Sequence, residues 1–222
     1  MATSPLLTAL ARCQPGPVLP IDLNGPDVAQ LDFSASNPLL TQADLRDTAA
    51  FAAVVAELLA RQNARIGLGG YLENRMVFRP SATLSGRILH LGVDVWVPAG
   101  TPVLAALPAR VHSRAENPGF GPTVILLHEL EGISFFSLYG HLARREALAL
   151  MPGQALAQGA AFAAVGAPPE NGDWPPHLHV QLITDLQGRE GNFPGVAPVT
   201  EQAVWAALCP NPNLILRSEH LV

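Results

Sequence analysis

The chain has 222 residues, enough for one large domain or for one domain with an appendage. It is 49% hydrophobic, with 21 Pro, 19 Gly and only 14% charged residues, and this composition favours a loop-rich β protein over a helical bundle. The net charge of −5 gives no reason to expect nucleic acid or an anionic membrane as a partner. A membrane span is not expected either, because no stretch of 18 consecutive apolar residues occurs.

Residues 1–40 are rich in Pro, Asn and Asp and show little periodicity, which predicts an extended arm. The first residues, MATSPLLTALARCQPGP, lack the basic region of a secretory signal. Cys13 and Cys209 have no CxxC spacing, and two unpaired thiols are typical of a reducing compartment. We therefore expect a cytoplasmic location.

The segment 41–65, TQADLRDTAAFAAVVAELLARQNAR, predicts one long helix. Thr41 followed by Asp44 resembles a capping box at its start, and the glycines from Gly67 onward end it. Apolar residues recur at helical spacing over this segment. They are Leu45, Ala49, Phe51, Val54, Val55, Leu58 and Leu59.

From about Ile88 onward, short β-prone segments alternate with Pro, Gly and Asn. This pattern predicts a mainly β fold, a small antiparallel β-sandwich or barrel-like domain carrying an N-terminal extended arm and one helix. We divide the chain into residues 1–66, an arm and helix packing on the core, residues 67–200, the β-rich domain, and residues 201–222, a short helix and tail.

Two stretches carry side chains suited to metal chemistry. In WPPHLHVQL, His177 and His179 are two residues apart, so that on a strand both project to the same face. In HLGVDVWVP, His90 and Asp94 are four apart and would share either a strand face or a helix face. Gly92 and the alternating valines that follow it favour the strand.

Imidazole and carboxylate groups are good zinc ligands, and catalytic zinc takes three protein ligands and leaves a fourth position for water. Each pair taken alone is more often a polar strand face or a satisfied core histidine. Both pairs in one small domain favour an open metal site. His and Asp from one strand with His from another would supply it, and one histidine is left for proton transfer.

Three motifs in order, HLGVDVWVPAGTPVLAALPARV, LYGHL and HLHVQL, resemble the lysostaphin/LytM-type zinc metallopeptidases over about residues 86–183. The resemblance implies a small antiparallel β domain that binds one zinc ion per chain. Its ligands would be His90, Asp94 and His179.

The same resemblance implies that His141 and His177 are catalytic and flank the metal-bound water and the scissile carbonyl. We assign His177 as the general base and His141 as the hydrogen-bond donor to the oxyanion, although the two roles are exchangeable. The loop VGAPPENGDWPP departs from the Gly/Ser/Thr-rich loop of the family.

Three further side chains are candidates for substrate contact. Arg75 could bind a substrate carboxylate or be a plain surface arginine, and Tyr139 could line the groove or pack in the sheet. Trp174, next to the unusual prolines, could form one wall of the groove. His128 ends the buried pattern TVILLHEL and is expected to be structural.

A second resemblance covers almost the whole chain. Segments such as GGYLENRMVF and CPNPNLIL are similar to a peptidase-like module found in bacterial fusions, between a phosphotransferase-like module and a class III aminotransferase module. This resemblance implies a bacterial protein whose substrate is a small cytoplasmic amide or peptide rather than the cell wall.

The leading hypothesis is a zinc-dependent hydrolase of peptide or related amide bonds, similar to a peptidoglycan endopeptidase. The alternatives are a non-catalytic LytM-like binding or regulatory module and a domain with a structural zinc. Filled ligand positions argue against the first alternative, and three ligands with two spare histidines argue against the second. The oligomeric state stays open.

Overall fold

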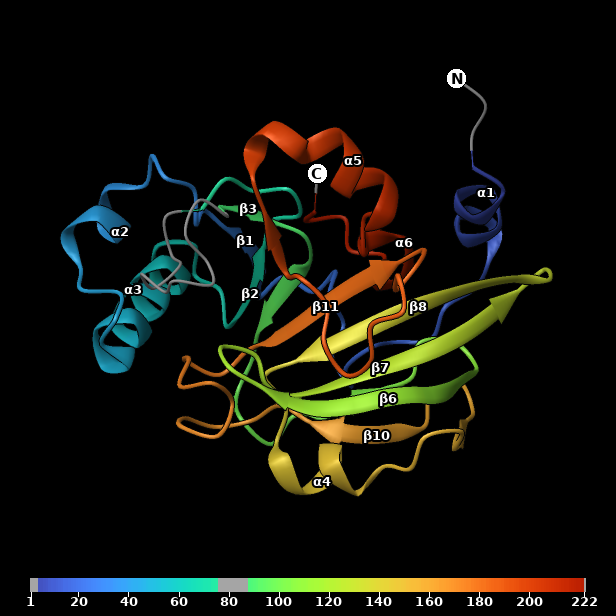
Figure 1. The fold of residues 1–222 in the computed structure, drawn as a ribbon. Coiled ribbons are helices and arrows are strands. Elements are labelled where there is room, and N and C mark those ends of the chain that lie inside the picture. Colours follow the sequence, from blue (N-terminus) through green and yellow to red (C-terminus); the bar gives the residue numbers. More distant parts are fainter. Residues whose placement is uncertain (1–3, 76–87, 222) are drawn as a thin grey trace.

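In the computed structural model, residues 4–75 and 88–221 are described, and they form a mainly β protein, as predicted (Figure 1). Within these ranges the largest sheet has eight strands in the order β1-β2-β4-β11-β8-β7-β6-β9. Its strands are β1 (Val28–Leu31), β2 (Ile66–Gly69), β4 (Val93–Trp96), β6 (Ala109–Asn117), β7 (Gly121–Leu130), β8 (Ile133–Gly140), β9 (Ala155–Leu156) and β11 (Leu178–Ile183). Two smaller sheets pair β3 (Leu89–His90) with β12 (Val196–Ala197) and β5 (Pro102–Leu104) with β10 (Ala161–Ala164).

The N-terminal arm contributes a strand to the large sheet. β1 pairs in parallel with β2, whereas the other ladders between named strands are antiparallel. The sheet is therefore mixed and remains open, and β1 lies at one edge. The boundary at residue 66 stays a prediction.

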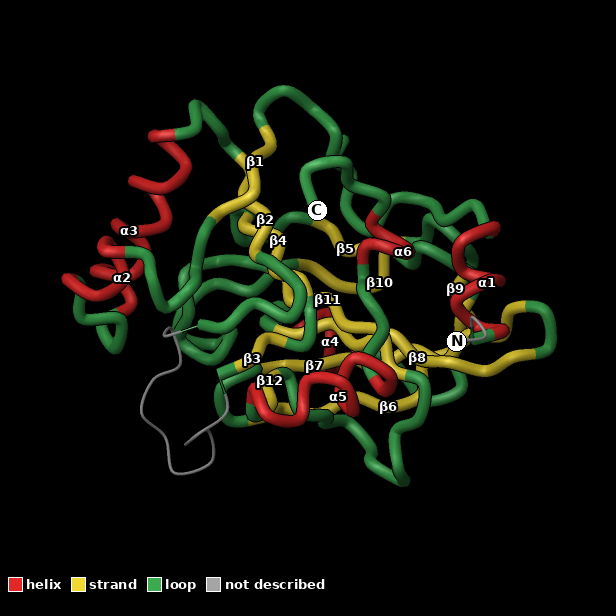
Figure 2. The backbone as a smooth tube through the Cα atoms, turned by 90° about the horizontal axis from the view of Figure 1, so that it is seen from above, coloured by secondary structure: helices red, strands yellow, loops and turns green. Residues whose placement is uncertain are grey.

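Short helices lie around the sheets (Figure 2). They are α1 (Pro5–Arg12), α2 (Pro38–Gln42), α3 (Thr48–Arg61), α4 (Arg144–Ala149), α5 (Gln202–Leu208) and α6 (Asn213–Leu216), with a 3-10 turn at Val199–Glu201. α5 agrees with the short helix expected near the C-terminus. Within the described ranges, none of these helices combines the length and apolarity needed to cross a bilayer.

The long helix begins later than the sequence indicates. Residues Pro38–Gln42 form the separate helix α2, and α3 starts at Thr48. The Asp47 side chain caps α3 by accepting a hydrogen bond from the Ala50 amide at 2.7 Å. The predicted start at Thr41 is therefore wrong, because Ala43 is extended and the effective cap is the second of two aspartates.

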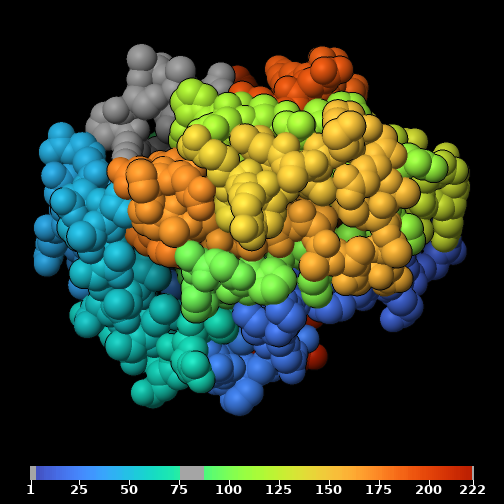
Figure 3. All heavy atoms as spheres, turned by 90° about the horizontal axis from the view of Figure 1, so that it is seen from below, coloured from blue at the N-terminus to red at the C-terminus, as the bar shows by residue number. Residues whose placement is uncertain are grey.

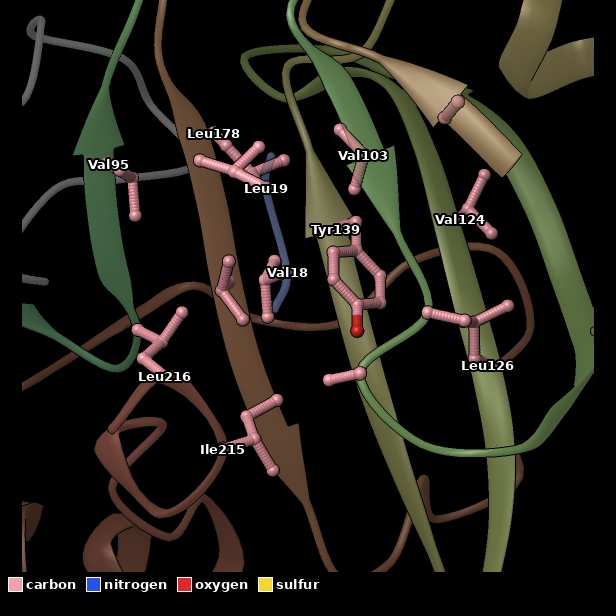
Figure 4. Close-up of a cluster of buried hydrophobic side chains, with 14 of the residues drawn as sticks. Val18, Leu19, Val95, Val103, Val124, Leu126, Tyr139, Leu178, Ile215 and Leu216 are labelled. Carbon is pink, nitrogen blue, oxygen red and sulfur yellow. The ribbon is translucent and has the colours of Figure 1, made fainter. Parts of the chain in front are cut away.

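Alternation along the strands distributes apolar side chains to both faces of the large sheet. One face carries the largest cluster, which includes Val95, Tyr139 and Leu178 (Figure 4). The other face carries two smaller clusters, one around Trp96 and one around Leu138. The polar residues described next lie on this second face.

Candidate metal and catalytic site

One row of residues crosses four neighbouring strands and carries part of the site. Gly69 of β2 pairs with Asp94 of β4, Asp94 pairs with His179 of β11, and His179 pairs with Gly140 of β8. Directly paired residues project to the same face, so the carboxylate and the imidazole are neighbours. Gly69 leaves room for a guanidinium, since a Cβ there would collide with Arg75 Nη2.

The adjacent row brings the other two predicted histidines together. When the pairing of β4 with β11 is continued by one residue, Trp96 on β4 lies opposite His177, just before β11. Their rings stack with centroids 4.3 Å apart. The His141 ring lies 4.2 Å from the His177 ring, centroid to centroid. The structure thus gathers all five residues of the predicted metal and catalytic set on one face.

His90 reaches this cluster from a different strand than expected. His90 and Asp94 were predicted to share one strand, but β3 ends at His90 and β4 begins at Val93. β3 pairs with β12, through Val196, while β4 pairs with β11, so the chain changes sheets between them. The single-strand prediction is therefore wrong, although the two side chains still meet.

Three donor atoms converge in the centre of the cluster. His90 Nε2 and His179 Nδ1 are 3.0 Å apart, and Asp94 Oδ1 lies 3.0 Å from His179 Nδ1 and 3.3 Å from His90 Nε2. The other nitrogen of His90, Nδ1, lies 3.1 Å from the Gly70 carbonyl. Because a carbonyl only accepts, Nδ1 carries the proton and Nε2 presents a lone pair to the cluster.

Arg75 contacts Asp94 rather than an open groove. Its Nη1 donates to Asp94 Oδ2, and its Nε donates to Glu73 Oε2 at 2.7 Å. The second Glu73 oxygen accepts from the Phe33 amide at 2.9 Å. Arg75 is buried, and two of its donors are used, so the predicted bidentate contact with a substrate carboxylate does not fit. Arg75 instead forms a buried ion pair with Asp94.

The buried charges shift the protonation of the site. Burial alone would raise the pKa of Asp94, but the neighbouring His90, the Arg75 guanidinium and the His179 ring hold that pKa well below its usual range. Burial, followed by the Arg75 charge, lowers the pKa of His90 to about 4. Asp94 is therefore ionised and His90 neutral at pH 7.

His141 and His177 have the same hydrogen-bonding pattern. Nδ1 of His141 donates to the Asn171 carbonyl, and Nδ1 of His177 donates to the Pro175 carbonyl, each at 2.8 Å. Burial lowers the pKa of both rings, and for His141 the neighbouring His177 lowers it further. Both are neutral at pH 7 with an unprotonated Nε2, and that of His177 lies 4.0 Å from Asp94 Oδ1.

The backbone of His141 is held in an uncommon conformation. Its φ is +61°, which is unusual for a residue other than glycine. Two backbone hydrogen bonds hold it there, from the His141 amide to Phe120 at 2.9 Å and from the Gly166 amide to the His141 carbonyl at 2.8 Å. Such outliers cluster at functional sites, and this one directs the His141 ring toward His177.

The two aromatic candidates have different surroundings. Tyr139 is fully buried in the cluster on the opposite face of the sheet, so it packs in the sheet and does not line the site (Figure 4). Trp174 lies beside the site, with its ring centroid 6.4 Å from that of His177. Its indole N–H donates to the Gly119 carbonyl at 2.8 Å, and its role toward substrate stays a prediction.

The N-terminal helix α3 packs against the loop that precedes His177. The Thr48 hydroxyl donates to the Asp173 carbonyl at 2.8 Å, and the Phe51 ring lies 6.0 Å from the Trp174 ring. In Figure 3 the cyan atoms of this part of the chain adjoin the orange atoms of the loop. The aromatic cluster beside the histidines is therefore built by the N-terminal part of the chain together with Trp96 and the loop that carries Trp174.

Two polar partners in the cluster, one buried and one partly buried, were missed from the sequence. Gln181 lies 3.0 Å, Oε1 to Nε2, from His179, and Glu73 holds Arg75. A signal for Gln181 was available, because it continues the two-residue spacing of His177 and His179 on one strand face. Glu73 lies in the irregular connection after β2, where residue spacing does not predict which way a side chain points.

Part of the chain matches the sequence model of a known protein family. Residues 88–192 match the sequence model of Peptidase family M23. No curated protein matches the chain significantly. Among solved structures, Csd3 from Helicobacter pylori is 27% identical with a TM-score of 0.36, and the match covers 44% of this chain and 24% of Csd3.

Two other solved structures have a similarly low sequence identity and TM-score. A zinc-containing peptidase from Vibrio cholerae is 22% identical with a TM-score of 0.35, covering 47% of this chain and 30% of that one. The catalytic domain of lysostaphin from Staphylococcus simulans, described as an antimicrobial peptidase, is 20% identical with a TM-score of 0.38, covering 53% of this chain and 80% of that one. The chain thus spans less than a third of the Csd3 and Vibrio cholerae chains.

The predicted resemblance to lysostaphin/LytM-type peptidases is confirmed at the level of the family, while the resemblance to a fusion module stays a prediction. The matched segment contains all five residues of the predicted metal and catalytic set, His90, Asp94, His141, His177 and His179. Residues 88–192 of this chain therefore match Peptidase family M23.

Proposed function

We propose that the chain is a zinc-dependent hydrolase of peptide or related amide bonds. The observation that carries this proposal is the spacing of the three donor atoms, which are 3.0–3.3 Å apart. Ligands about 2.0–2.1 Å from a tetrahedral zinc ion lie about 3.3 Å from one another. Two imidazole nitrogens and one carboxylate oxygen at this spacing fit zinc.

The chemistry of the donors supports the same conclusion. Among the described residues, His90, Asp94 and His179 are the group of potential ligands that could hold a metal ion. An ionised carboxylate facing imidazole nitrogens in a buried site favours a cation between them. Three protein ligands is also the number that catalytic zinc sites use. We therefore assign these three residues as the zinc ligands, with one ion per chain.

When bound, zinc supplies a water molecule whose pKa falls toward about 7 and polarises the scissile carbonyl. We assign His177 as the residue that accepts a proton at Nε2, because this atom is unprotonated and lies 4.0 Å from Asp94 Oδ1. Its Nδ1 stays bonded to Pro175, which keeps the ring oriented during transfer.

His141 is suited to share this proton rather than to donate to an oxyanion from the start. The neutral His141 ring has its hydrogen on Nδ1, bonded to Asn171, so Nε2 has no hydrogen to donate. Two imidazolium rings with centroids 4.2 Å apart would repel, so one proton at a time resides on the pair. The protonated ring can then donate to the leaving amine.

The substrate class is a separate proposal. The family match supports peptide substrates. The resemblance to the fusion module implies a small amide or peptide in the cytoplasm rather than cell wall. Purified chain incubated with intact peptidoglycan, with short peptides and with small amides discriminates these substrates. Cleavage of intact peptidoglycan alone would contradict the small-substrate proposal.

Metal content is the direct test of the metal assignment. We expect about one zinc per chain in the wild type and in His177→Ala, and loss of zinc in His179→Ala, because His179 is assigned as a ligand and His177 is not. His112→Ala, on β6, is the matched control and should keep its zinc. Elemental analysis after dialysis against trace zinc measures this.

Activity separates the catalytic assignment from the metal assignment. His177→Ala should retain zinc but lose hydrolysis by about 10²–10⁴-fold, the usual contribution of a general base. A wild type that binds no zinc on reconstitution contradicts the proposal. Zinc binding without turnover of any peptide or amide would instead indicate a non-catalytic binding module.

A further inference from the structure

Gln181 is a fully buried polar residue next to the proposed metal site. It lies two positions after His179 on β11, so both side chains project to the same face. Gln181 Oε1 and His179 Nε2 are 3.0 Å apart. His179 therefore meets Gln181 on one edge of its ring, while its other nitrogen, Nδ1, faces Asp94 and His90.

The orientation of the Gln181 amide follows from its other contacts. Gln181 Nε2 lies 3.1 Å from the Pro194 carbonyl oxygen and 3.3 Å from Cys209 Sγ. A carbonyl oxygen has no hydrogen to donate, so the amide nitrogen must face Pro194. The amide oxygen then faces His179 and can only accept a hydrogen.

This orientation determines where His179 carries its proton. An acceptor at Gln181 Oε1 requires a hydrogen on His179 Nε2, and the neutral ring then has a lone pair on Nδ1. Nδ1 is the nitrogen 3.0 Å from Asp94 Oδ1. The opposite tautomer would place two lone pairs against each other at Gln181. Its Nδ1 hydrogen would face Asp94 Oδ1 and occupy the metal position, so Gln181 and Asp94 compete for the tautomer of His179 in the absence of metal.

We propose that Gln181 is a positioning residue that selects the metal-binding tautomer of His179, held in turn by Pro194 and Cys209. This inference rests on the proposed function. Residues outside the ligand set then keep Nδ1 of His179 unprotonated. The other histidines of the cluster instead donate their Nδ1 hydrogens to backbone carbonyls. Outer partners of this kind raise ligand basicity and fix ring orientation.

The test compares zinc affinity in variants of the full chain. Gln181→Met preserves length and removes the acceptor, and it should weaken zinc binding by about 10–100-fold, measured by competition with a chromophoric chelator. Gln181→Glu keeps an acceptor toward His179 but loses the donor to Pro194, so it should recover the affinity only in part. Gln202→Met, on the exposed surface of α5, is the matched control and should bind like the wild type.

The visible spectrum of the cobalt-substituted protein adds a readout that a general loss of stability does not produce. Gln181→Met should change the ligand-field bands, and Gln181→Glu should restore them in part. Equal zinc affinities of the wild type and Gln181→Met overturn this inference but leave the proposed function intact. Absence of zinc binding in the wild type overturns the proposed function itself.

A measurement on the unmodified chain keeps the inference testable if Gln181→Met fails to fold. Nitrogen-15 chemical shifts of the histidine rings in metal-free wild-type protein report the tautomer of His179. A hydrogen on Nε2 supports the inference. A neutral ring with its hydrogen on Nδ1 overturns it, whatever the variants show.

Discussion

Arg75 joins the proposed metal ligand Asp94 to the N-terminal arm. Its guanidinium contacts Asp94 and Glu73, and Glu73 accepts a hydrogen bond from the Phe33 amide. The guanidinium also lies over the Phe33 ring, 5.2 Å from its centroid. All these groups are buried or nearly so, so each charge depends on its partner for compensation.

Removing Arg75 should therefore destabilise the metal-free protein strongly. Arg75→Met leaves Asp94 and Glu73 without their cation, and breaking a buried pair from one side typically costs about 3–5 kcal/mol. Urea denaturation of the metal-free protein measures the change in unfolding free energy. Arg12→Met is the matched control, because Arg12 pairs with Glu131 on the exposed surface and should contribute at most about 1 kcal/mol. Equal effects of the two substitutions would contradict this account.

At the scale of elements, the break between β3 and β4 places His90 and leaves space for His179. The break falls at residues 91–92, and a Cβ at Gly92 would lie 2.5 Å from His179 Cε1 and 2.7 Å from its Nε2. No real side chain is accommodated at such distances. Gly92 thus forms the surface against which the His179 ring is held.

Gly92→Ala should displace the His179 ring and lower zinc affinity, because the added methyl group occupies the position of Cε1. Chelator competition on the folded variant measures this, with circular dichroism to establish folding. Gly16→Ala is the control, since its Cβ would meet the flexible Gln158 side chain at 3.3 Å and the Ala106 carbonyl oxygen at 3.7 Å, an ordinary contact distance. Unchanged zinc affinity in Gly92→Ala would show that the ring has more room than the structure gives it.

On the scale of the whole molecule, the fold buries several neutral imidazoles. His128 is the one remote from the proposed metal site, and its Nε2 lies 2.6 Å from the Ser137 hydroxyl. Its Nδ1 donates to the Pro108 carbonyl at 3.0 Å, so Ser137 donates to Nε2. These contacts agree with the structural role expected for His128. Burial lowers its pKa to about 4.

The buried His128 predicts a loss of stability in acid. The unfolded chain takes up a proton near pH 6.5 and the folded chain only near pH 4, so unfolding free energy falls as pH decreases through this window. The contribution is fully present above about pH 6.5 and amounts to about 3 kcal/mol once lost. Urea denaturation of metal-free wild type and His128→Gln between pH 7 and 4 should show a shallower decline in the variant. Parallel declines would contradict the assignment.

The class of the fold and the residues of the candidate site could be predicted from the sequence alone. Two-residue alternation places His177 and His179 on one strand face, and the ordered motifs select His90, Asp94 and His141 as their companions. These features are local, since strand periodicity and motif order need no knowledge of which strands become neighbours.

The hydrogen-bond partners that hold these side chains in place become visible only in the tertiary structure. Arg75, Glu73 and Gln181 acquire their roles from partners far along the chain, such as Asp94, Phe33 and Pro194. The start of α3 at Thr48, the separation of β3 from β4 and the burial of Tyr139 away from the site also depend on competing caps and strand pairings. Sequence spacing carries no direction in irregular connections, so which hydrogen-bond acceptor faces which ring nitrogen is determined only when the strands and loops pack together.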